Sequence, residues 1–205
     1  MTTLEDLLRG DSDVGADAAR AAERATAVAR AEGLADVSYA IEPSPVGELV
    51  VAVTPRGLIR VAYGAEERAD TVLEELARRV SPRVLEAPAA LDEVRRELDE
   101  YFEGKRTSFD LPVDWRLHDG FSRRVLRATR RIPYGKLLTY AEVAAKAGSP
   151  RGSRAAGNAL GSNRIPIVVP CHRVVRTGGM LGGYTGGIER KQYLLGLEGV
   201  PPFNQ

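Results

Sequence analysis

Residues 165–175 read IPIVVPCHRVV, two apolar, largely β-branched runs on either side of Pro-Cys-His-Arg. Cys171 is the single cysteine of the chain, and His172 is one of its two histidines. Thiolate is the reactive form of cysteine, and an imidazole or nearby cations favour it, so the neighbouring Arg173 and Arg176 strengthen a nucleophilic interpretation. The alternative is that a lone cysteine packs as a small buried hydrophobe. This run alone leaves both interpretations open.

Length and cysteine content limit the class of protein. The 205 residues suffice for one ordinary domain or two small ones. One cysteine cannot form an internal disulfide, and no Cys/His cluster has zinc-ligand spacing, so we expect a reduced protein without metal or cofactor. Residues 1–10 contain acids where a signal peptide needs basic and then apolar residues, and no apolar run approaches a membrane span. We expect a cytoplasmic protein, nucleoid-associated if bacterial.

Charge divides the chain at residue 113. Residues 1–112 contain 14 Lys and Arg against 23 Asp and Glu, whereas residues 113–205 contain 15 against 5. A basic half attracts polyanions, because phosphates neutralised by Lys or Arg release counterions from DNA. The alternative is that the two halves dock on each other through opposite charge, and both statements can hold.

The first half has the pattern of a small sheet with helices. Alanine-rich residues 14–32 predict a helix ended by Gly33, although a partly disordered leader is equally consistent with the first dozen residues. Short β-type runs follow at 37–41, 49–53 and 58–63 and predict an antiparallel sheet. Helical spacing is present at 66–80 and 88–104, and an extended run at 108–113 ends this half.

The second half is organised as a series of helices. A helix is predicted over 120–131, with Phe121, Val125 and Leu126 facing a core and four arginines facing water. Thr139 and Glu142 have capping-box spacing, which predicts a helix from there to Ala147. A second short helix over 151–160 follows after a glycine-containing turn, so this pair is a candidate helix-turn-helix.

The second helix of that pair is almost bare. Glycine, alanine and serine dominate residues 152–159, and Arg154 is the side chain that projects far. One interpretation is tight packing against the core of the protein. The other is close approach to nucleic acid, with Arg154 reaching the bases and Arg151 and Arg164 available for phosphates. The charge of the second half favours nucleic acid.

A glycine-rich segment follows the cysteine. Residues 177–187 contain six glycines and one tyrosine, which favours a loop that wraps a ligand over a plain linker. Residues 188–197 predict a terminal helix, and Glu198 then places a negative charge at the unfavourable end of its dipole. Such a carboxylate needs a partner, and His172 is the candidate.

These residues together resemble one family. The run 165–175, with Tyr140 before it, Arg154 and Asn163 between, and residues 182–187 and Glu198 after it, closely resembles the O6-alkylguanine-DNA alkyltransferases over about residues 38–200. The resemblance implies irreversible transfer of an alkyl group from O6 of a damaged guanine in duplex DNA to the cysteine. It also implies a monomer, and leaves activity on O4-alkylthymine and cooperative binding along DNA open.

The resemblance also implies roles for single residues. Glu198 would bond His172, which acts through a water on Cys171, while Tyr140 protonates the departing guanine and Asn163 orders the nearby turn. The other implied positions belong to DNA binding. Arg154 would fill the space of a base rotated out of the duplex, and the bare helix with Arg151, Ala155 and Gly157 would lie in the minor groove. The elements that hold the flipped base would include Val174, Tyr184, Thr185 and Gly186.

The implied fold is α+β. It has a leader over 1–36, a ribonuclease H-like sheet and helix domain over 37–112, and a helical domain with a winged helix-turn-helix over 113–205. Zinc ligands of some relatives are missing here, and Asn158 and Arg164 occupy positions that vary. A non-catalytic sensor of alkylated DNA or a DNA-binding regulator would not need Pro-Cys-His-Arg, and a cysteine hydrolase would ignore duplex DNA.

Overall fold

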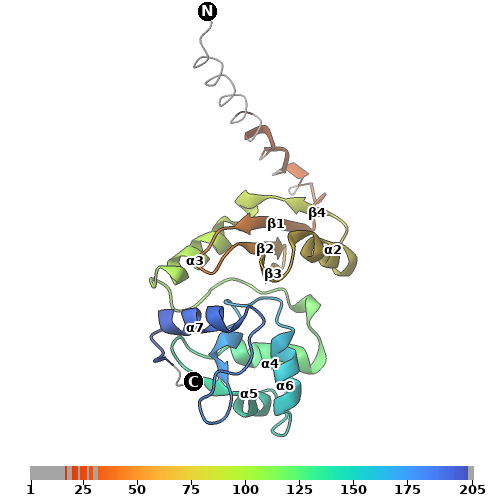
Figure 1. The fold of residues 1–205 in the computed structure, drawn as a ribbon. Helices are drawn as coiled ribbons and strands as arrows, with labels where there is room; N and C mark the ends of the chain where they lie inside the picture. Colours follow the sequence, from red (N-terminus) through yellow and green to blue (C-terminus); the bar gives the residue numbers. More distant parts are fainter. Residues whose placement is uncertain (1–16, 18–19, 23, 27, 30–31, 203–205) are drawn as a thin grey trace, which may run out of the picture.

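The computed structural model describes residues 17, 20–22, 24–26, 28–29 and 32–202. The prediction of an alanine-rich helix over 14–32 falls partly outside the described residues, and the described ones between 17 and 29 are helical. From residue 37 onward the chain forms an α+β fold in which a sheet with its helices is stacked on a helical second half (Figure 1). Among the described residues, we find no helix that combines the length and the apolar character needed to cross a bilayer.

The sheet has the strand order β3-β2-β1-β4. Its first three strands are β1 (Val37–Glu42), β2 (Leu49–Thr54) and β3 (Gly57–Tyr63), and they pair antiparallel as the alternation of glycine, proline and β-branched residues predicts. The fourth strand, β4 (Val84–Glu86), pairs parallel with β1 and was missed. Three residues are too short a run to show strand periodicity.

Both faces of the sheet are buried. Alternate residues of β2 point to opposite faces: Val50 and Ala52 join the cluster that contains Val72 and Leu76 of α2 (Ala69–Arg79). Leu49 and Val51 join a larger cluster on the other side, which includes residues of α3 (Asp92–Phe102) and continues into the second half of the chain, where it contains Cys171 and Leu194. One apolar core therefore spans both halves.

The predicted helices of the first half are shorter in the structure. The helix expected from residue 66 begins at Ala69, because residues 64–67 form a turn in which the Glu66 and Glu67 amides donate to the Tyr63 carbonyl. The helix expected over 88–104 splits into a 3-10 turn, η1 (Pro88–Leu91), and α3. Proline is well placed in such a first turn because it has no amide hydrogen to leave unpaired.

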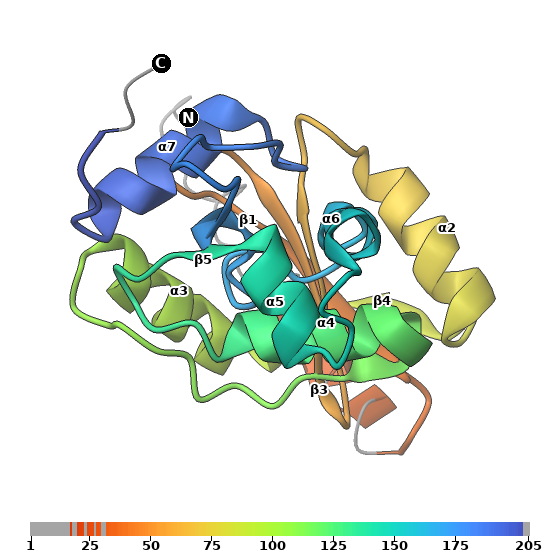
Figure 2. The ribbon, with the colours of Figure 1, turned by 90° about the horizontal axis from the view of Figure 1, so that it is seen from below.

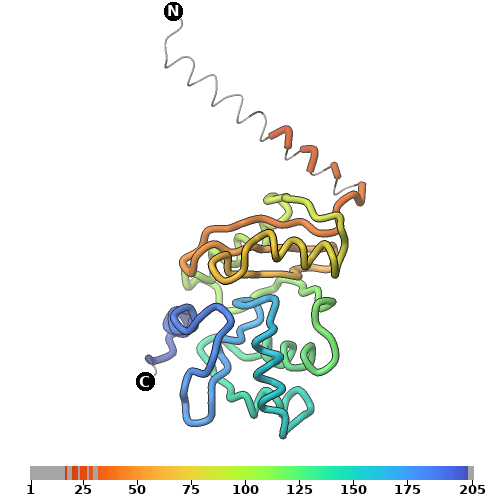
Figure 3. Tube along the Cα trace, turned by 45° about the vertical axis from the view of Figure 1, so that its right-hand side comes forward, coloured from red at the N-terminus to blue at the C-terminus, as the bar shows by residue number. Residues whose placement is uncertain are grey.

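The connection between the halves runs along the edge of the sheet (Figure 3). The amide of Leu58 in β3 donates to the Pro112 carbonyl at 2.8 Å, and the Asp114 amide donates back to the Leu58 carbonyl at 2.9 Å. The extended run expected over 108–113 therefore forms one isolated bridge, between Leu58 and Val113, rather than a strand. A short 3-10 turn, η2 (Trp115–Leu117), follows.

Three helices of the second half pack against one another: α4 (Gly120–Arg130), α5 (Tyr140–Lys146) and α6 (Ser153–Gly161) (Figure 2). The predicted capping box at the start of α5 is present, with the Glu142 amide 3.2 Å from the Thr139 hydroxyl and the Thr139 amide 2.6 Å from the Glu142 carboxylate. The remaining elements are β5 (Leu138–Thr139), η3 (Cys171–Arg173), β6 (Val174–Val175), which pairs parallel with β5, and α7 (Ile188–Leu197). The wing of the expected winged helix-turn-helix stays a prediction.

The expectation that the arginines of α4 face water is wrong for two of them. Arg124 and Arg127 are exposed, and Arg124 also donates to the Ala147 carbonyl. Arg123 and Arg130 are partly buried and donate to the carbonyls of His118 and Leu111. Arginine covers apolar surface with its stem while its guanidinium reaches a carbonyl, which the sequence pattern does not reveal.

We predict that Gly57→Ala destabilises the protein more than Gly104→Ala. Both glycines have a positive φ, +119° and +71°, but a Cβ at Gly57 would lie 2.2 Å from the Pro112 carbonyl oxygen, whereas a Cβ at Gly104 would meet nothing within 4 Å. We expect a loss of more than about 3 kcal/mol at Gly57 and of about 1 kcal/mol at Gly104, measured by urea unfolding. Equal losses would show that the contact between the turn and the connection is unimportant.

Candidate active site

The cysteine lies on a strained turn between the core and α7. Ile167 has φ of 72°, which no other non-glycine residue shows among those the structure describes, and it is fully buried. A β-branched residue in this region costs energy that the surroundings must offset, and such strain gathers at functional sites. The next residues close tight turns, with the Cys171 amide donating to the Val169 carbonyl at 2.8 Å. The turn leads into η3, whose first residue, Cys171, has 5% of its surface exposed.

Asn163 holds this turn together and touches the thiol. Its Nδ2 donates to the Val169 carbonyl at 2.9 Å and lies 3.1 Å from the Cys171 Sγ, while its Oδ1 accepts from the Ile165 amide at 3.0 Å. The carboxamide is buried and uses both ends. It can therefore keep one N–H aimed at the sulfur.

His172 and Glu198 are in contact inside the protein. The His172 Nε2 lies 2.8 Å from the Glu198 Oε1, and neither side chain is exposed. Glu198 directly follows α7, so the carboxylate at the unfavourable end of the helix has a partner. It also accepts from the Tyr101 hydroxyl at 2.7 Å and from the Gly135 amide at 3.1 Å.

Arg173 completes the shell of the carboxylate. Its Nε and Nη2 donate to Glu198 at 2.9 Å and 2.8 Å, and its Nη1 donates to the Ile132 carbonyl at 2.6 Å. Burial by itself would raise the pKa of Glu198, but the hydrogen bonds from His172 and Arg173 outweigh it and hold that pKa at about 2. Glu198 is thus a carboxylate at neutral pH.

The charge of Glu198 fixes the tautomer of His172. Burial lowers the pKa of His172, and the bond to Glu198 opposes this only in part, so the ring is neutral at neutral pH. Because a carboxylate accepts and does not donate, Nε2 carries the ring proton and Nδ1 has a free lone pair. Nδ1 is buried and has no hydrogen-bond partner among the described residues. This nitrogen can act as a base.

The thiol itself is protonated at rest. Burial raises the pKa of Cys171 to about 11, and the hydrogen bond from Asn163 and the charge of Lys191 oppose that rise. The expectation that Arg173 favours the thiolate is wrong, because its guanidinium is engaged by Glu198. Arg176 is exposed, and its effect on the thiol stays a prediction. The thiol therefore becomes a nucleophile only when a base removes its proton.

Lys191 and Tyr101 belong to the site and were missed. Lys191 is fully buried on α7, and its Nζ donates to the carbonyls of Val174, at 2.6 Å, and Leu181. Burial lowers its pKa to about 8, against the opposing effect of Cys171. Its position three residues before the buried Leu194 puts it on the apolar face of α7, a signal that the sequence contained. Tyr101 follows the apolar spacing of α3 and gave no such signal.

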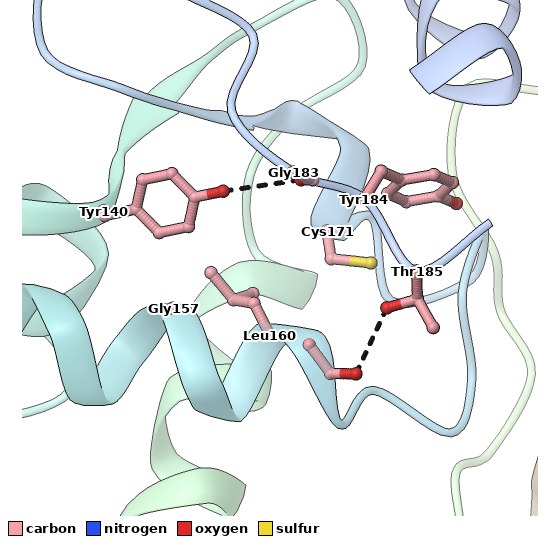
Figure 4. Close-up of a pocket in the computed structure, with 8 residues that line it drawn as sticks. Tyr140, Gly157, Leu160, Cys171, Gly183, Tyr184 and Thr185 are labelled. Atoms are coloured by element: carbon pink, nitrogen blue, oxygen red, sulfur yellow. Dashed lines mark hydrogen bonds between the residues drawn. The ribbon is translucent and has the colours of Figure 1, made fainter. Parts of the chain in front are cut away.

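A pocket opens on the sulfur (Figure 4). Its volume is about 310 Å3, and the glycine-rich segment closes one side of it: the Thr185 hydroxyl donates to the Gly161 carbonyl of α6 at 3.2 Å, and the Tyr140 hydroxyl lies 3.5 Å from the Gly183 carbonyl. The lining residues are Tyr140, Gly157, Leu160, Gly161, Cys171, Gly183, Tyr184 and Thr185.

The remaining predicted residues lie around this pocket. Arg151, Arg154, Ala155 and Asn158 are exposed on and before α6, and Gly157 of the same helix lines the pocket. Val174 is buried in β6. Gly186 is also buried, packed against Tyr63 rather than lining the pocket.

Arg164 does not serve the role expected for it. Its Nη2 lies 2.9 Å from the Glu75 carboxylate on α2, and its carbonyl accepts from the Val61 amide of β3 at 2.9 Å. The expectation that this guanidinium is available for phosphates is therefore wrong. The contacts instead attach the turn that contains Asn163 to the sheet domain.

Comparison with known families accounts for both halves of the chain. A family model described as "6-O-methylguanine DNA methyltransferase, ribonuclease-like domain" matches residues 37–115, and one described as "6-O-methylguanine DNA methyltransferase, DNA binding domain" matches residues 120–200. The chain belongs to the 6-O-methylguanine DNA methyltransferase family. The resemblance inferred from residues 165–175 and their surroundings is confirmed, as is the α+β fold with a ribonuclease-like first half.

Named relatives of this methyltransferase family agree over most of the chain. The constitutive methylated-DNA–protein-cysteine methyltransferase of Bacillus subtilis is 35% identical over 165 residues, covering 79% of this chain and 95% of the relative. The Rattus norvegicus methylated-DNA–protein-cysteine methyltransferase is 32% identical, covering 80% and 83%. A crystal structure of Mycobacterium tuberculosis OGT in complex with DNA covers 78% of this chain and 92% of its own, with 37% identity and a TM-score of 0.67.

We predict that Glu198→Gln flattens the dependence of stability on pH below pH 5. The folded-state pKa of about 2 lies below the ordinary 4.5, so this carboxylate contributes stability that is fully present above about pH 4.5 and is lost as the pH falls toward 2. The loss amounts to about 3 kcal/mol in the wild type. Chemical unfolding at a series of pH values measures it.

A matched control for this measurement is Glu93→Gln, at an exposed position in the first turn of α3. This variant should keep the wild-type profile. The Glu198→Gln variant should also be less stable at pH 7, because Arg173 loses its charged partner. Parallel profiles for the wild type and Glu198→Gln would contradict the role of the carboxylate.

Proposed function

We propose that this protein repairs duplex DNA by moving the alkyl group of an O6-alkylguanine to the Sγ of Cys171, in a single irreversible turnover. The observation that carries the proposal is a buried thiol that opens on a pocket of about 310 Å3 and is backed by a His172–Glu198 pair, in a chain that matches the methyltransferase family in both halves. The protein acts as a cytoplasmic monomer, nucleoid-associated if bacterial.

The first step is removal of the thiol proton. With a pKa of about 11, Cys171 needs a base, and the free lone pair on the His172 Nδ1 takes the proton through one water. The imidazolium that results is stabilised by the Glu198 carboxylate at 2.8 Å. Asn163 and Lys191 place a hydrogen bond and a positive charge next to the developing thiolate.

The second step is displacement at the alkyl carbon. A carbon–sulfur bond forms as the bond between that carbon and O6 breaks, and the electron pair stays on guanine. Guanine leaves more readily if it is protonated as it departs. Burial raises the pKa of Tyr140, so its hydroxyl carries a proton at neutral pH and, at the pocket wall, can donate it. The thioether on Cys171 is stable, and the protein is consumed.

The substrate base must leave the duplex to reach this pocket. O6 cannot approach a thiol with 5% exposure while the base is stacked, so base flipping is required. The exposed Arg154 fills the gap, and the small residues Ala155 and Gly157 let α6 approach the minor groove in a winged helix-turn-helix arrangement. Arg151 contacts phosphate, and Tyr184, Thr185 and the backbone of Cys171 and Val174 hold the flipped base. Gly186 keeps this segment packed against Tyr63.

Incubation with a duplex that contains O6-methylguanine should add one methyl group to the Cys171 peptide and stop at one equivalent. The reason is that the acceptor thiol is not regenerated. Intact-mass spectrometry with peptide mapping measures the product, and Cys171→Ala should remain unmodified. A wild-type protein of unchanged mass would contradict the proposal and leave a non-catalytic DNA-binding role.

Arg154→Ala should slow transfer from duplex DNA by about tenfold or more and change transfer from the free base O6-methylguanine little, because the guanidinium is needed only to extrude the base. Single-turnover rates with the two substrates give the comparison. Arg96→Ala, which removes an exposed arginine from α3, is the matched control and should leave both rates unchanged. Equal losses on both substrates would refute a role in extrusion.

A further inference from the structure

One wall of the pocket is held from outside by the sheet domain. Tyr63 is the last residue of β3 and is 4% exposed. Its hydroxyl lies 2.7 Å from the hydroxyl of Tyr184, and the two rings meet edge to face with centroids 6.2 Å apart. This hydrogen bond joins the first half of the chain to the glycine-rich segment that closes the pocket.

Tyr184 lies between that anchor and the reacting groups. It lines the same pocket as Cys171, with its ring beside the sulfur (Figure 4). The same ring meets His172 edge to face, with centroids 6.4 Å apart. An alkyl group in transit from O6 to sulfur has to fit next to this ring. The position of Tyr184 therefore limits the space for the group.

Arg190 fixes Tyr63 and the segment at once. Its guanidinium lies over the Tyr63 ring, 5.0 Å from the centroid. Its Nε donates to the Val46 carbonyl of the β1–β2 connection at 2.7 Å, and its Nη1 donates to the Gly186 carbonyl at 2.8 Å and contacts Glu66. One arginine of α7 thus connects the sheet domain to the pocket segment.

Gly186 shows how closely Tyr63 is fitted. A Cβ at Gly186 would lie 2.4 Å from the Tyr63 ring, so any larger residue would displace either the ring or the segment. Tyr63 is therefore held by a hydroxyl partner, a cation on its face and a backbone without a side chain. Burial raises the pKa of Tyr63 and of Tyr184, so the bond joins two neutral hydroxyls over the usual pH range.

We propose that Tyr63 is a specificity-determining positioning residue: by fixing the Tyr184 ring it sets the size of the alkyl group that the Cys171 pocket accepts. The inference rests on the proposed function and deepens it. A fixed ring accepts a methyl group and resists a bulky one, whereas a ring released from its anchor can move aside. Discrimination by size then depends on a residue that does not touch the substrate.

The test compares Tyr63→Phe with the wild type on two duplexes of one sequence, containing O6-methylguanine or O6-benzylguanine. Single-turnover rate constants at saturating protein give a benzyl-to-methyl ratio, which should rise about fivefold when the hydroxyl is removed. Tyr39→Phe is the matched control, because its hydroxyl, on β1 of the same sheet, contacts Glu86 at 3.5 Å instead. It should leave the ratio unchanged.

Tyr184→Phe removes the other hydroxyl of the same bond. It should change the ratio to the same extent as Tyr63→Phe, and the double variant should change it no further, since both act through one interaction. An unchanged ratio in Tyr63→Phe, including one accompanied by a lower melting temperature, would overturn the inference while leaving the proposed function intact. A wild type that transfers neither group would contradict the proposed function itself.

Discussion

The buried carboxylate of Glu198 is the interaction on which the site depends. A charge without water must be fully hydrogen-bonded, and Glu198 receives donors from four directions: His172, Arg173, Tyr101 and the Gly135 amide. These donors come from the nucleophile turn, from α3 of the sheet domain and from the connection between α4 and β5. The group that sets the tautomer of His172 is thus also a junction of the fold.

In this site the Arg173 cation close to Cys171 in the sequence pairs with the carboxylate and not with the thiol. Arg173 is engaged by Glu198, and the cation that lowers the pKa of the thiol is Lys191, whose own pKa is lowered by burial to about 8. A thiol with a pKa of about 11 reacts slowly with adventitious electrophiles. In the proposed mechanism, His172 supplies the base, and a substrate in the pocket supplies the alkyl carbon and the leaving group.

The elements and contacts that could be predicted are those with a signature in neighbouring residues of the sequence. Helix α7 and the three antiparallel strands follow from glycine and proline punctuation, and the partner of Glu198 followed from its unfavourable place at a helix end. Contacts whose direction has no local signature could not be predicted. Tyr101 reads as an ordinary core residue, the guanidinium of Arg164 reads as free, and β4 is too short to show a period.

The Tyr101 hydroxyl bears on whether domains can be exchanged between relatives. This hydroxyl, from the first half of the chain, donates at 2.7 Å to Glu198, which belongs to the site of the second half. The boundary between two family domains is therefore not a boundary between functions. A chimera that joins this second half to the ribonuclease-like half of a relative keeps all four donors to the carboxylate only if the new partner supplies a hydroxyl at the same point in space.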